Sequence, residues 1–402
     1  MSNVVNCVQD SAHEPLPARD ENVELSVVLP CLNESETVGI CVRKAVEALR
    51  ANRIQGEVIV ADNGSTDGSQ EIARAEGARV VAVPEKGYGS ALRGGIQAAC
   101  GRYVLMADSD DTYDISHLPR FLEELRAGAD LVMGNRFLGG IHDNAMPFLH
   151  RYLGNPVLTW VGRVFFHSDC GDFHCGMRAF RKEKVEEMDL RTTGMEFASE
   201  MVVKASLRGL KVKEVPTTLS PSGRSRAPHL RTWRDGWRHL RFLLMYSPRW
   251  LFLYPGFALM TIGVAGCIWL LPRPVHVGDI GFDVHTLLYA FVAITLGFQL
   301  VGFAVFTKVF AIAEGLLPED ERLKRAFRYI TLETGLVAGF LMVAGGIGGS
   351  ALAVSDWGAH NFGALNPSYM LRLVLPSAFS LMLGVEVICG SFFLSILGLK
   401  RR

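Results

Sequence analysis

The sequence predicts a mostly parallel α/β sheet domain followed by an all-α domain of four membrane-spanning helices. Over residues 25–133, short apolar runs of strand length alternate with segments of helical periodicity, the pattern of a parallel sheet with crossover helices. Beyond residue 250, four long apolar runs cover residues 251–271, 286–312, 331–353 and 370–398. Each run reaches the ~20 residues that a helix needs to cross a ~30 Å hydrocarbon core.

The elements of the sheet domain follow a polar, aperiodic segment at 1–24, which we expect to be a disordered tail. The predicted strands are Leu25–Leu29, Glu57–Ala61, Arg79–Val83, Tyr103–Ala107 and Asp130–Met133. Three helices are predicted between these strands. The first begins at Ser35 or Glu36 and runs to about Ala51, the second covers residues 67–76, and the third follows a glycine-rich turn within Gly87–Ala99. We expect the sheet domain to cover 25–229.

Polar side chains follow the predicted strands at the points where they end. Asn33 and Glu34 come after the first strand, Asp62 and Asn63 after the second, and Asp108 after the fourth. Because the carboxyl ends of parallel strands meet at one edge of a sheet, these residues converge there. Open α/β sheets bind their ligands at this edge.

The strand Tyr103–Ala107 runs directly into an acidic cluster, Asp108-Ser109-Asp110-Asp111. A core cannot hold such a cluster, because an unpaired buried carboxylate costs too much free energy. Two carboxylates spaced i, i+2 can hold a divalent cation, and that cation can grip a diphosphate. The pattern therefore indicates an enzyme that uses a nucleotide-sugar; the alternative is a solvated acidic turn.

Basic residues predict the orientation of the four spans. They gather before the first span, between the second and third spans, and at the C-terminus, whereas Arg273 is the one basic residue of the two other loops. Basic loops stay inside, so both termini and the sheet domain are expected on the cytoplasmic side of the inner membrane. The first residues carry no apolar signal segment, which agrees with that placement. The three basic sets are Arg231, Arg234, Arg238, Arg241 and Arg249; Arg322, Lys324, Arg325 and Arg328; and Lys400, Arg401 and Arg402.

Residues 230–250 form an expected amphipathic juxtamembrane helix, with apolar residues such as Trp233 and Trp237 on one face and a basic stripe beside it. Such a helix lies in the membrane interface and would place the site near a lipid phosphate. The alternative is ordinary positive flanking charge with aromatic anchors. Within the spans, Glu386 is an unexplained carboxylate, and the glycines of 345–349 permit close helix packing and a homo-oligomer.

The bulk composition narrows the class of partner. The formal net charge is zero, so no nucleic-acid partner is indicated. Six of the eight cysteines lie before the spans, where a reducing compartment disfavours disulfides. His167, Cys170, His174 and Cys175 could be read as a zinc set, but their spacing matches no common zinc pattern.

Three strings together resemble the family 2 glycosyltransferases of the Rossmann-like GT-A fold, and more closely their polyprenyl-phosphate members, which are similar to dolichyl-phosphate mannose and glucose synthases. The strings are VVLPCLNE (27–34), VIVADNGSTDGS (58–69) and VLMADSDDTYD (104–114). The resemblance implies that Pro30, Asn33 and Glu34 line the nucleotide pocket, that Asp62 contacts the base or ribose, that Lys86-Gly87 approaches the nucleotide, and that Asp108 and Asp110 hold Mg²⁺ or Mn²⁺. Asp111 and Asp114 could belong to this set or cap the following helix.

On the acceptor side, GNRFLGG (134–140) resembles a Gly-Ser-Arg segment of the family, with Asn135 in place of Ser. The resemblance makes Arg136 and Arg151 candidates for gripping the acceptor phosphate. DFHCGMRAF (172–180) matches the acceptor segment, so Asp172 would position the acceptor and Arg178 would serve charge or structure. An arginine usual in related synthases is replaced by Ser220, and Arg224 or Arg226 could supply the missing charge.

These residues lead to a hypothesis of inverting hexose transfer from a nucleotide-sugar, with UDP-glucose favoured over GDP-mannose, to a polyprenyl phosphate. One rival is a processive polysaccharide synthase, which usually carries Gln-x-x-Arg-Trp before the membrane. Here Tyr246 stands where that Gln would be. A second rival is a membrane scaffold without enzymatic activity, which the acidic pair and the acceptor segment argue against.

Overall fold

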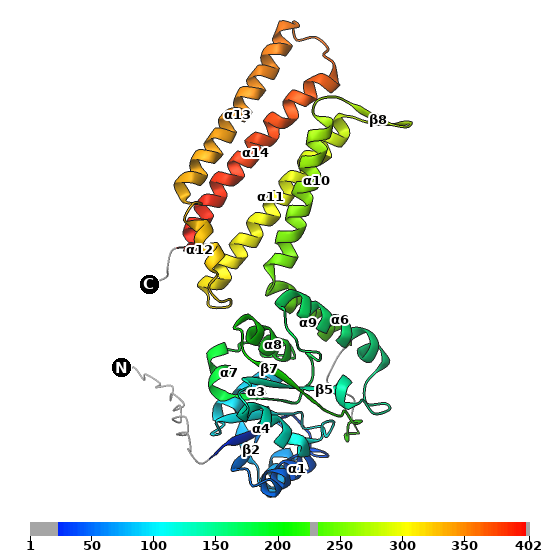
Figure 1. Ribbon diagram of the computed structural model, residues 1–402, viewed down its shortest axis with the longest axis vertical. Coiled ribbons are helices and arrows are strands. Elements are labelled where there is room, and N and C mark those ends of the chain that lie inside the picture. The colour runs from blue at the N-terminus through cyan, green and yellow to red at the C-terminus, as the bar shows by residue number, and fades with distance from the viewer. Residues whose placement is uncertain (1–22, 226–231, 399–402) are drawn as a thin grey trace, which may run out of the picture. The chain divides into compact units, whose positions relative to one another are not determined.

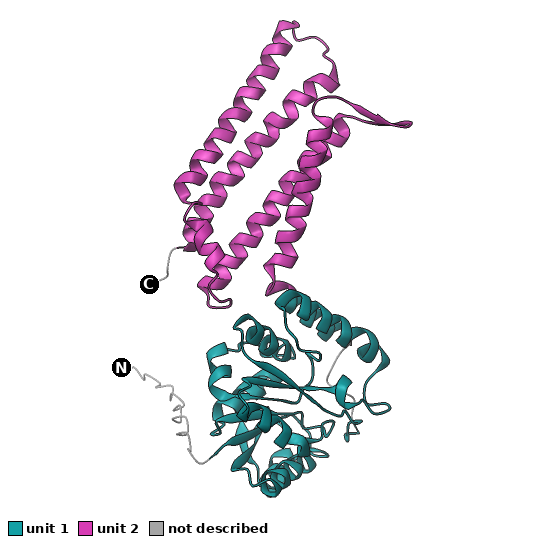
Figure 2. Ribbon diagram, in the orientation of Figure 1, with its two compact units in different colours: residues 1–243 teal, residues 244–402 magenta. Residues whose placement is uncertain are grey.

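The structure is a computed structural model that describes residues 23–225 and 232–398. The chain divides into two compact units, residues 1–243 and 244–402 (Figure 2). Residues 1–22 of the expected tail, and Arg226, lie outside the described residues.

Unit 1 is built on a seven-stranded sheet with the strand order β3-β2-β1-β4-β6-β5-β7. Only β6 runs antiparallel to its neighbours, so the predicted mostly parallel sheet is confirmed. β6 and β7 were not predicted from the sequence. The strands are β1 (Leu25–Cys31), β2 (Gly56–Asp62), β3 (Arg79–Ala82), β4 (Tyr103–Met106), β5 (Leu131–Asn135), β6 (Arg178–Arg181) and β7 (Val212–Pro216).

Helices flank the sheet (Figure 1), which explains why its central strand β4 is apolar throughout. Along β1, Val27 and Leu29 pack in one core with α1, whereas Val28 faces Gly95 of α3 on the other side. The helices of unit 1 are α1 (Val38–Ala51), α2 (Ser69–Ala75), α3 (Tyr88–Ala98), α4 (Leu118–Arg126), α5 (Arg136–Gly139), α6 (Asn155–Phe166), α7 (Lys182–Met188), α8 (Phe197–Leu207) and α9 (Thr232–Met245), with short η1 (Ile115–His117) and η2 (His150–Gly154).

The first helix begins later than predicted. Its N-cap is Thr37, not Ser35 or Glu36. The Ser35 backbone N–H donates to Asp67 at 2.9 Å, and Thr37 Oγ1 donates to the Ser109 carbonyl at 2.6 Å. These contacts hold the preceding residues in a turn beside the acidic cluster.

Within its described residues, unit 2 contains four helices that are long and apolar enough to cross a membrane, as predicted. The π-helical turn η3 (Arg249–Leu253) leads into the first, the hairpin of β8 (Val275–Val277) and β9 (Ile280–Phe282) joins the first to the second, and short α12 (Glu321–Phe327) precedes the third. The helices of the four spans are α10 (Tyr254–Leu270), which together with η3 makes the span Arg249–Leu270, α11 (Val284–Ala313), α13 (Leu332–Ala359) and α14 (Pro367–Gly398).

Small residues allow these helices to pack closely in pairs. A Cβ on Gly263 of α10 would meet the Ala290 carbonyl of α11, and one on Gly346 of α13 would lie 2.7 Å from the Ser377 carbonyl of α14. Part of the predicted glycine pattern therefore serves packing within the chain, and a homo-oligomer stays a prediction. Glu386 of α14 has a partner, since Gln299 Nε2 of α11 donates to it at 2.5 Å.

Candidate active site

A cavity of about 940 Å³ opens at the carboxyl edge of the sheet in unit 1. Its polar part comes from the ends of β1 and β4 and from the turn before α3. Its apolar part comes from residues 145–158 and from α9. Three of the five polar residues predicted to converge on this edge, Glu34, Asn63 and Asp108, therefore meet a second, apolar set that lies far away in sequence.

Four of the predicted donor-side residues line the cavity: Pro30, Glu34, Lys86 and Gly87. Lys86 Nζ donates to the Asn63 carbonyl at 2.7 Å, and the Gly87 N–H donates to Asn63 Oδ1 at 2.8 Å, so one asparagine fixes the whole turn. Gly87 has φ 129° and lies against the Thr193 carbonyl, where a Cβ would overlap it. Only glycine suits this position.

Asn33 and Asp62 lie outside the lining of the cavity. Asn33 adopts φ 58°, and its Oδ1 accepts from the Thr66 N–H at 2.8 Å. Asp62 is buried and accepts from the Gly64 and Ser65 N–H groups, each at 3.1 Å, and from Gln70 at 2.7 Å. In the structure both residues build the turns that shape the edge, and contact with a nucleotide stays a prediction for them.

The predicted metal ligands Asp108 and Asp110 both line the cavity. Burial and the nearby negative charge of Asp110 raise the pKa of Asp108 to about 6, although Tyr88 donates its hydroxyl to Asp108 at 2.9 Å. Arg224 donates to Asp110 at 2.9 Å and to Glu34 at 2.8 Å, so it brings a positive charge to this edge, and its part in gripping a diphosphate stays a prediction. Two carboxylates that repel each other suit a divalent cation.

Asp111 and Asp114, the two other acidic residues of this segment, have partners within the fold. Asp111 adopts φ 59° and forms an ion pair with Lys44 at 2.7 Å. Asp114 accepts from the Ser116 N–H at 3.1 Å and caps η1. The capping alternative is confirmed for Asp114 and is wrong for Asp111.

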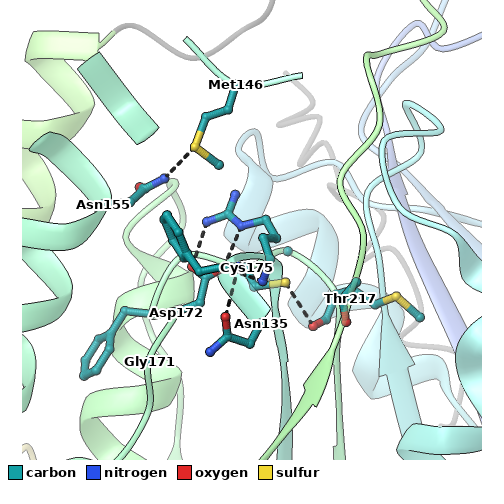
Figure 3. A network of polar contacts seen from close by, with 12 residues as sticks. Asn135, Met146, Asn155, Gly171, Asp172, Cys175 and Thr217 are labelled. Atoms are coloured by element: carbon teal, nitrogen blue, oxygen red, sulfur yellow. Dashed lines mark hydrogen bonds and ion pairs between the residues drawn. The ribbon is translucent and has the colours of Figure 1, made fainter. Parts of the chain in front are cut away.

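Arg136 and Asp172 form a buried bidentate ion pair, with Nε–Oδ2 at 2.7 Å and Nη2–Oδ1 at 2.8 Å. The Arg136 backbone N–H also donates to Asp172 at 3.1 Å. Asp172 has no exposed surface, whereas Arg136 lines the cavity. Figure 3 shows Asp172 beside Asn135, whose Oδ1 caps α5 by accepting from the Phe137 and Leu138 N–H groups. Asp172 can therefore act on a ligand only through Arg136.

The other arginines predicted for the site differ in their surroundings. Arg178 is fully buried and donates to the carbonyls of Phe173, Cys175 and Ala198. Arg151 lies outside the cavity lining, with its guanidinium 5.5 Å from the centre of the Tyr152 ring. Arg178 thus combines structure with an internal positive charge, and phosphate contact by Arg151 stays a prediction.

Tyr88, Asp235 and His239 are among the cavity-lining residues that were not predicted from the sequence. Tyr88 directly follows the predicted Lys86-Gly87 pair, and the spacing of α9 places Asp235 and His239 together away from its tryptophan face. Among the described residues no group of three or more His, Cys, Asp or Glu side chains could hold a metal ion. The interpretation of His167, Cys170, His174 and Cys175 as a zinc set is therefore wrong. A cation held by Asp108 and Asp110 would need further ligands from the nucleotide-sugar.

The fold and this edge define a nucleotide-sugar-type transferase, and comparison with known proteins gives the family. The model "Glycosyl transferase family 2" matches residues 26–189, and "Glycosyltransferase family 2 C-terminal transmembrane region" matches residues 305–398. The chain is 38% identical over 395 residues to the low-salt glycan biosynthesis hexosyltransferase Agl6 of Haloferax volcanii, which covers 97% of this chain and 94% of that protein. The chain belongs to the family 2 glycosyltransferases and is a glycosyltransferase.

Two further similarities are more distant. The dolichyl-phosphate hexose transferase of Haloferax volcanii is 33% identical over 48% of this chain and 81% of its own length. Among solved structures, glucosyl-3-phosphoglycerate synthase from Mycobacterium tuberculosis with Mg²⁺ and UDP has a TM-score of 0.43 and 23% identity, over 55% of this chain and 78% of that one.

Proposed function

We propose that this chain transfers a hexosyl group, with inversion, from a nucleoside diphosphate sugar to a polyprenyl phosphate at the cytoplasmic face of the membrane. UDP-glucose is the favoured donor. The observation that carries the proposal is the mixed lining of the cavity, which joins an acidic and basic edge to an apolar wall. A soluble acceptor would have no use for that wall.

The polar edge supports a nucleoside diphosphate. Lys86 and Arg224 supply positive charge for phosphate oxygens, and Asp108 and Asp110 supply oxygen ligands for a divalent cation. Mg²⁺ or Mn²⁺ held there would stabilise the charge of the departing diphosphate. Arg224 bridges Asp110 and Glu34, so it sets the position of one of these carboxylates.

The apolar wall supports a lipid acceptor. Met146, Leu149 and Leu153 line it from one segment, and Trp233 and Trp237 line it from α9. Leu153, Trp233 and Trp237 are exposed in the structure, which is costly unless a lipid or a membrane covers them. Arg136 lines the same cavity, and its guanidinium suits an anionic phosphate.

The chemistry of the acceptor reduces the need for a general base. A phosphate monoester has a second pKa near 6 and is largely ionised at neutral pH, so it attacks without losing a proton to the enzyme. Asp172 is fully engaged by Arg136 and orients that guanidinium. The similarity to two Haloferax proteins, a hexosyltransferase and a dolichyl-phosphate hexose transferase, supports the hexose and the lipid phosphate.

The experiment uses the purified full chain in detergent with Mg²⁺ or Mn²⁺ and a polyprenyl phosphate. Labelled UDP-glucose, UDP-galactose, UDP-GlcNAc and GDP-mannose are offered in parallel, and label is counted in the organic phase. We expect lipid label from UDP-glucose that chelation abolishes. Donor hydrolysis or a polymer, with no lipid label from any donor, would overturn the proposal.

A further inference from the structure

Two histidines and a serine form a cluster in the wall of the cavity. His174 belongs to the acceptor segment, His239 to α9 and Ser199 to α8. Ser199 Oγ lies 2.8 Å from His239 Nδ1 and 3.5 Å from His174 Nε2, and the two rings meet edge to face with centres 4.7 Å apart. Both histidines line the cavity, so the cluster joins α9 to the acceptor segment.

Both imidazoles are neutral at pH 7. Burial lowers the pKa of His239 to about 4, with Arg178 adding to that effect and Asp235 opposing it. Burial lowers the pKa of His174 well below its usual value, and electrostatic repulsion from His239, Arg136 and Arg178 lowers it further. A neutral imidazole has one N–H and one lone pair. Each ring therefore has one donor and one acceptor to place.

One of these nitrogens has no use within the described part of the chain. Nδ1 of His174 is buried and has no hydrogen-bond partner among the described residues, although the histidine itself lines the cavity. A buried polar atom left without a partner costs about 1–3 kcal/mol. A ligand in the cavity could supply the partner.

The bridge through Ser199 can set which proton that nitrogen carries. If His239 Nδ1–H donates to Ser199 and the Ser199 hydroxyl donates to His174 Nε2, then His174 Nδ1 carries the N–H. Arg136 and Arg178 make the surroundings positive, and the Asp235 carboxylate opposes this effect at His239. An anionic oxygen is the acceptor that a neutral N–H prefers in a positive pocket.

We infer that His174 binds the acceptor phosphate through its Nδ1–H, and that Ser199 and His239 are positioning residues that hold its tautomer. The inference deepens the proposed function and rests on it. It adds a second phosphate contact to the one proposed for Arg136. It also means that α9 contributes to the acceptor site through His239 as well as through its tryptophans.

The test compares two variants that keep different nitrogens. In His174→Asn the side-chain amide lies near the position of Nδ1, whereas in His174→Gln it lies near Nε2. We expect His174→Gln and His174→Ala to raise the KM for undecaprenyl phosphate about tenfold, the effect of one hydrogen bond to a charged group, with the donor KM within twofold. His174→Asn should keep the acceptor KM within about threefold.

A purely structural role for His174 reverses this order, since contact with Ser199 is made by Nε2 and His174→Gln would then be the better variant. That reversal, or equal acceptor KM values in all three variants, overturns the inference. His276→Asn, at an exposed histidine of β8, is the matched control. The wild-type chain distinguishes the two levels: failure to glycosylate undecaprenyl phosphate at all defeats the proposed function, whereas transfer with the wrong variant order defeats only this inference.

Discussion

Asp172→Asn tests whether Asp172 works through Arg136. The variant keeps the size of the side chain but removes the charge that faces a guanidinium only 8% exposed. Breaking a buried ion pair from one side costs about 3–5 kcal/mol, because the remaining charge stays buried without a partner. For a folded unit of about 200 residues, each kcal/mol shifts the melting temperature by about 2–4 °C.

The melting temperature of unit 1 in the full chain should therefore fall by roughly 6–20 °C. The acceptor KM should rise with it, since Arg136 loses its orientation. Differential scanning fluorimetry and acceptor titration measure the two effects. The double variant Arg136→Met with Asp172→Leu should recover most of the stability, because apolar residues of similar volume can replace a buried ion pair. It should recover none of the activity. An Asp172→Asn chain that melts and binds acceptor like the wild type would refute the reasoning.

Three further predictions concern the same unit. Gly176→Ala places a Cβ over the Asp108 carboxylate and 3.0 Å from the Tyr113 ring. In steady-state assays at saturating Mn²⁺, kcat should therefore fall at least about tenfold. A near-normal kcat would show that Asp108 has room to move. Arg224→Ala removes the bridge between Glu34 and Asp110. The donor KM should therefore rise about tenfold while the acceptor KM stays unchanged. A change in the acceptor KM alone would contradict this assignment. The lowered pKa of His239, about 4, means that the unfolded chain binds a proton that the folded chain does not between pH 6.5 and 4. The free energy of unfolding should thus fall by up to about 3 kcal/mol as the pH drops through this window. In thermal melts at different pH, the stability of His239→Gln should fall less steeply than that of the wild type. Equal slopes of stability against pH in the two chains would contradict this prediction.

The sequence predicted the strands whose apolar runs end in a clear turn, and it missed those that break this pattern. β6 begins with Arg178, which reads as a surface residue, but three backbone carbonyls satisfy its guanidinium inside the core. β7 carries Lys213 and Glu214 at the edge of the sheet, where side chains alternate between protein and solvent. Local pattern alone cannot reveal a buried charge that the fold neutralises.

The same limit applies to the site. Position after a strand was enough to predict that Asp108 and Glu34 reach the cavity. It could not separate Asp62, which builds a turn, from its neighbour Asn63, which lines the cavity. Contacts between distant residues, such as Arg224 with Glu34, depend on the fold and have no local signature.

The central claim, glycosylation of a lipid phosphate, is tested most directly by the fate of the acceptor phosphorus. The purified chain is incubated with undecaprenyl phosphate, UDP-glucose and Mn²⁺ and followed by ³¹P NMR, with Asp108→Asn as the inactive control. The account predicts that the phosphomonoester resonance of the lipid is replaced by a phosphodiester resonance as UDP accumulates, and only in the wild type. Release of UDP and free glucose with the lipid phosphomonoester unchanged would contradict it.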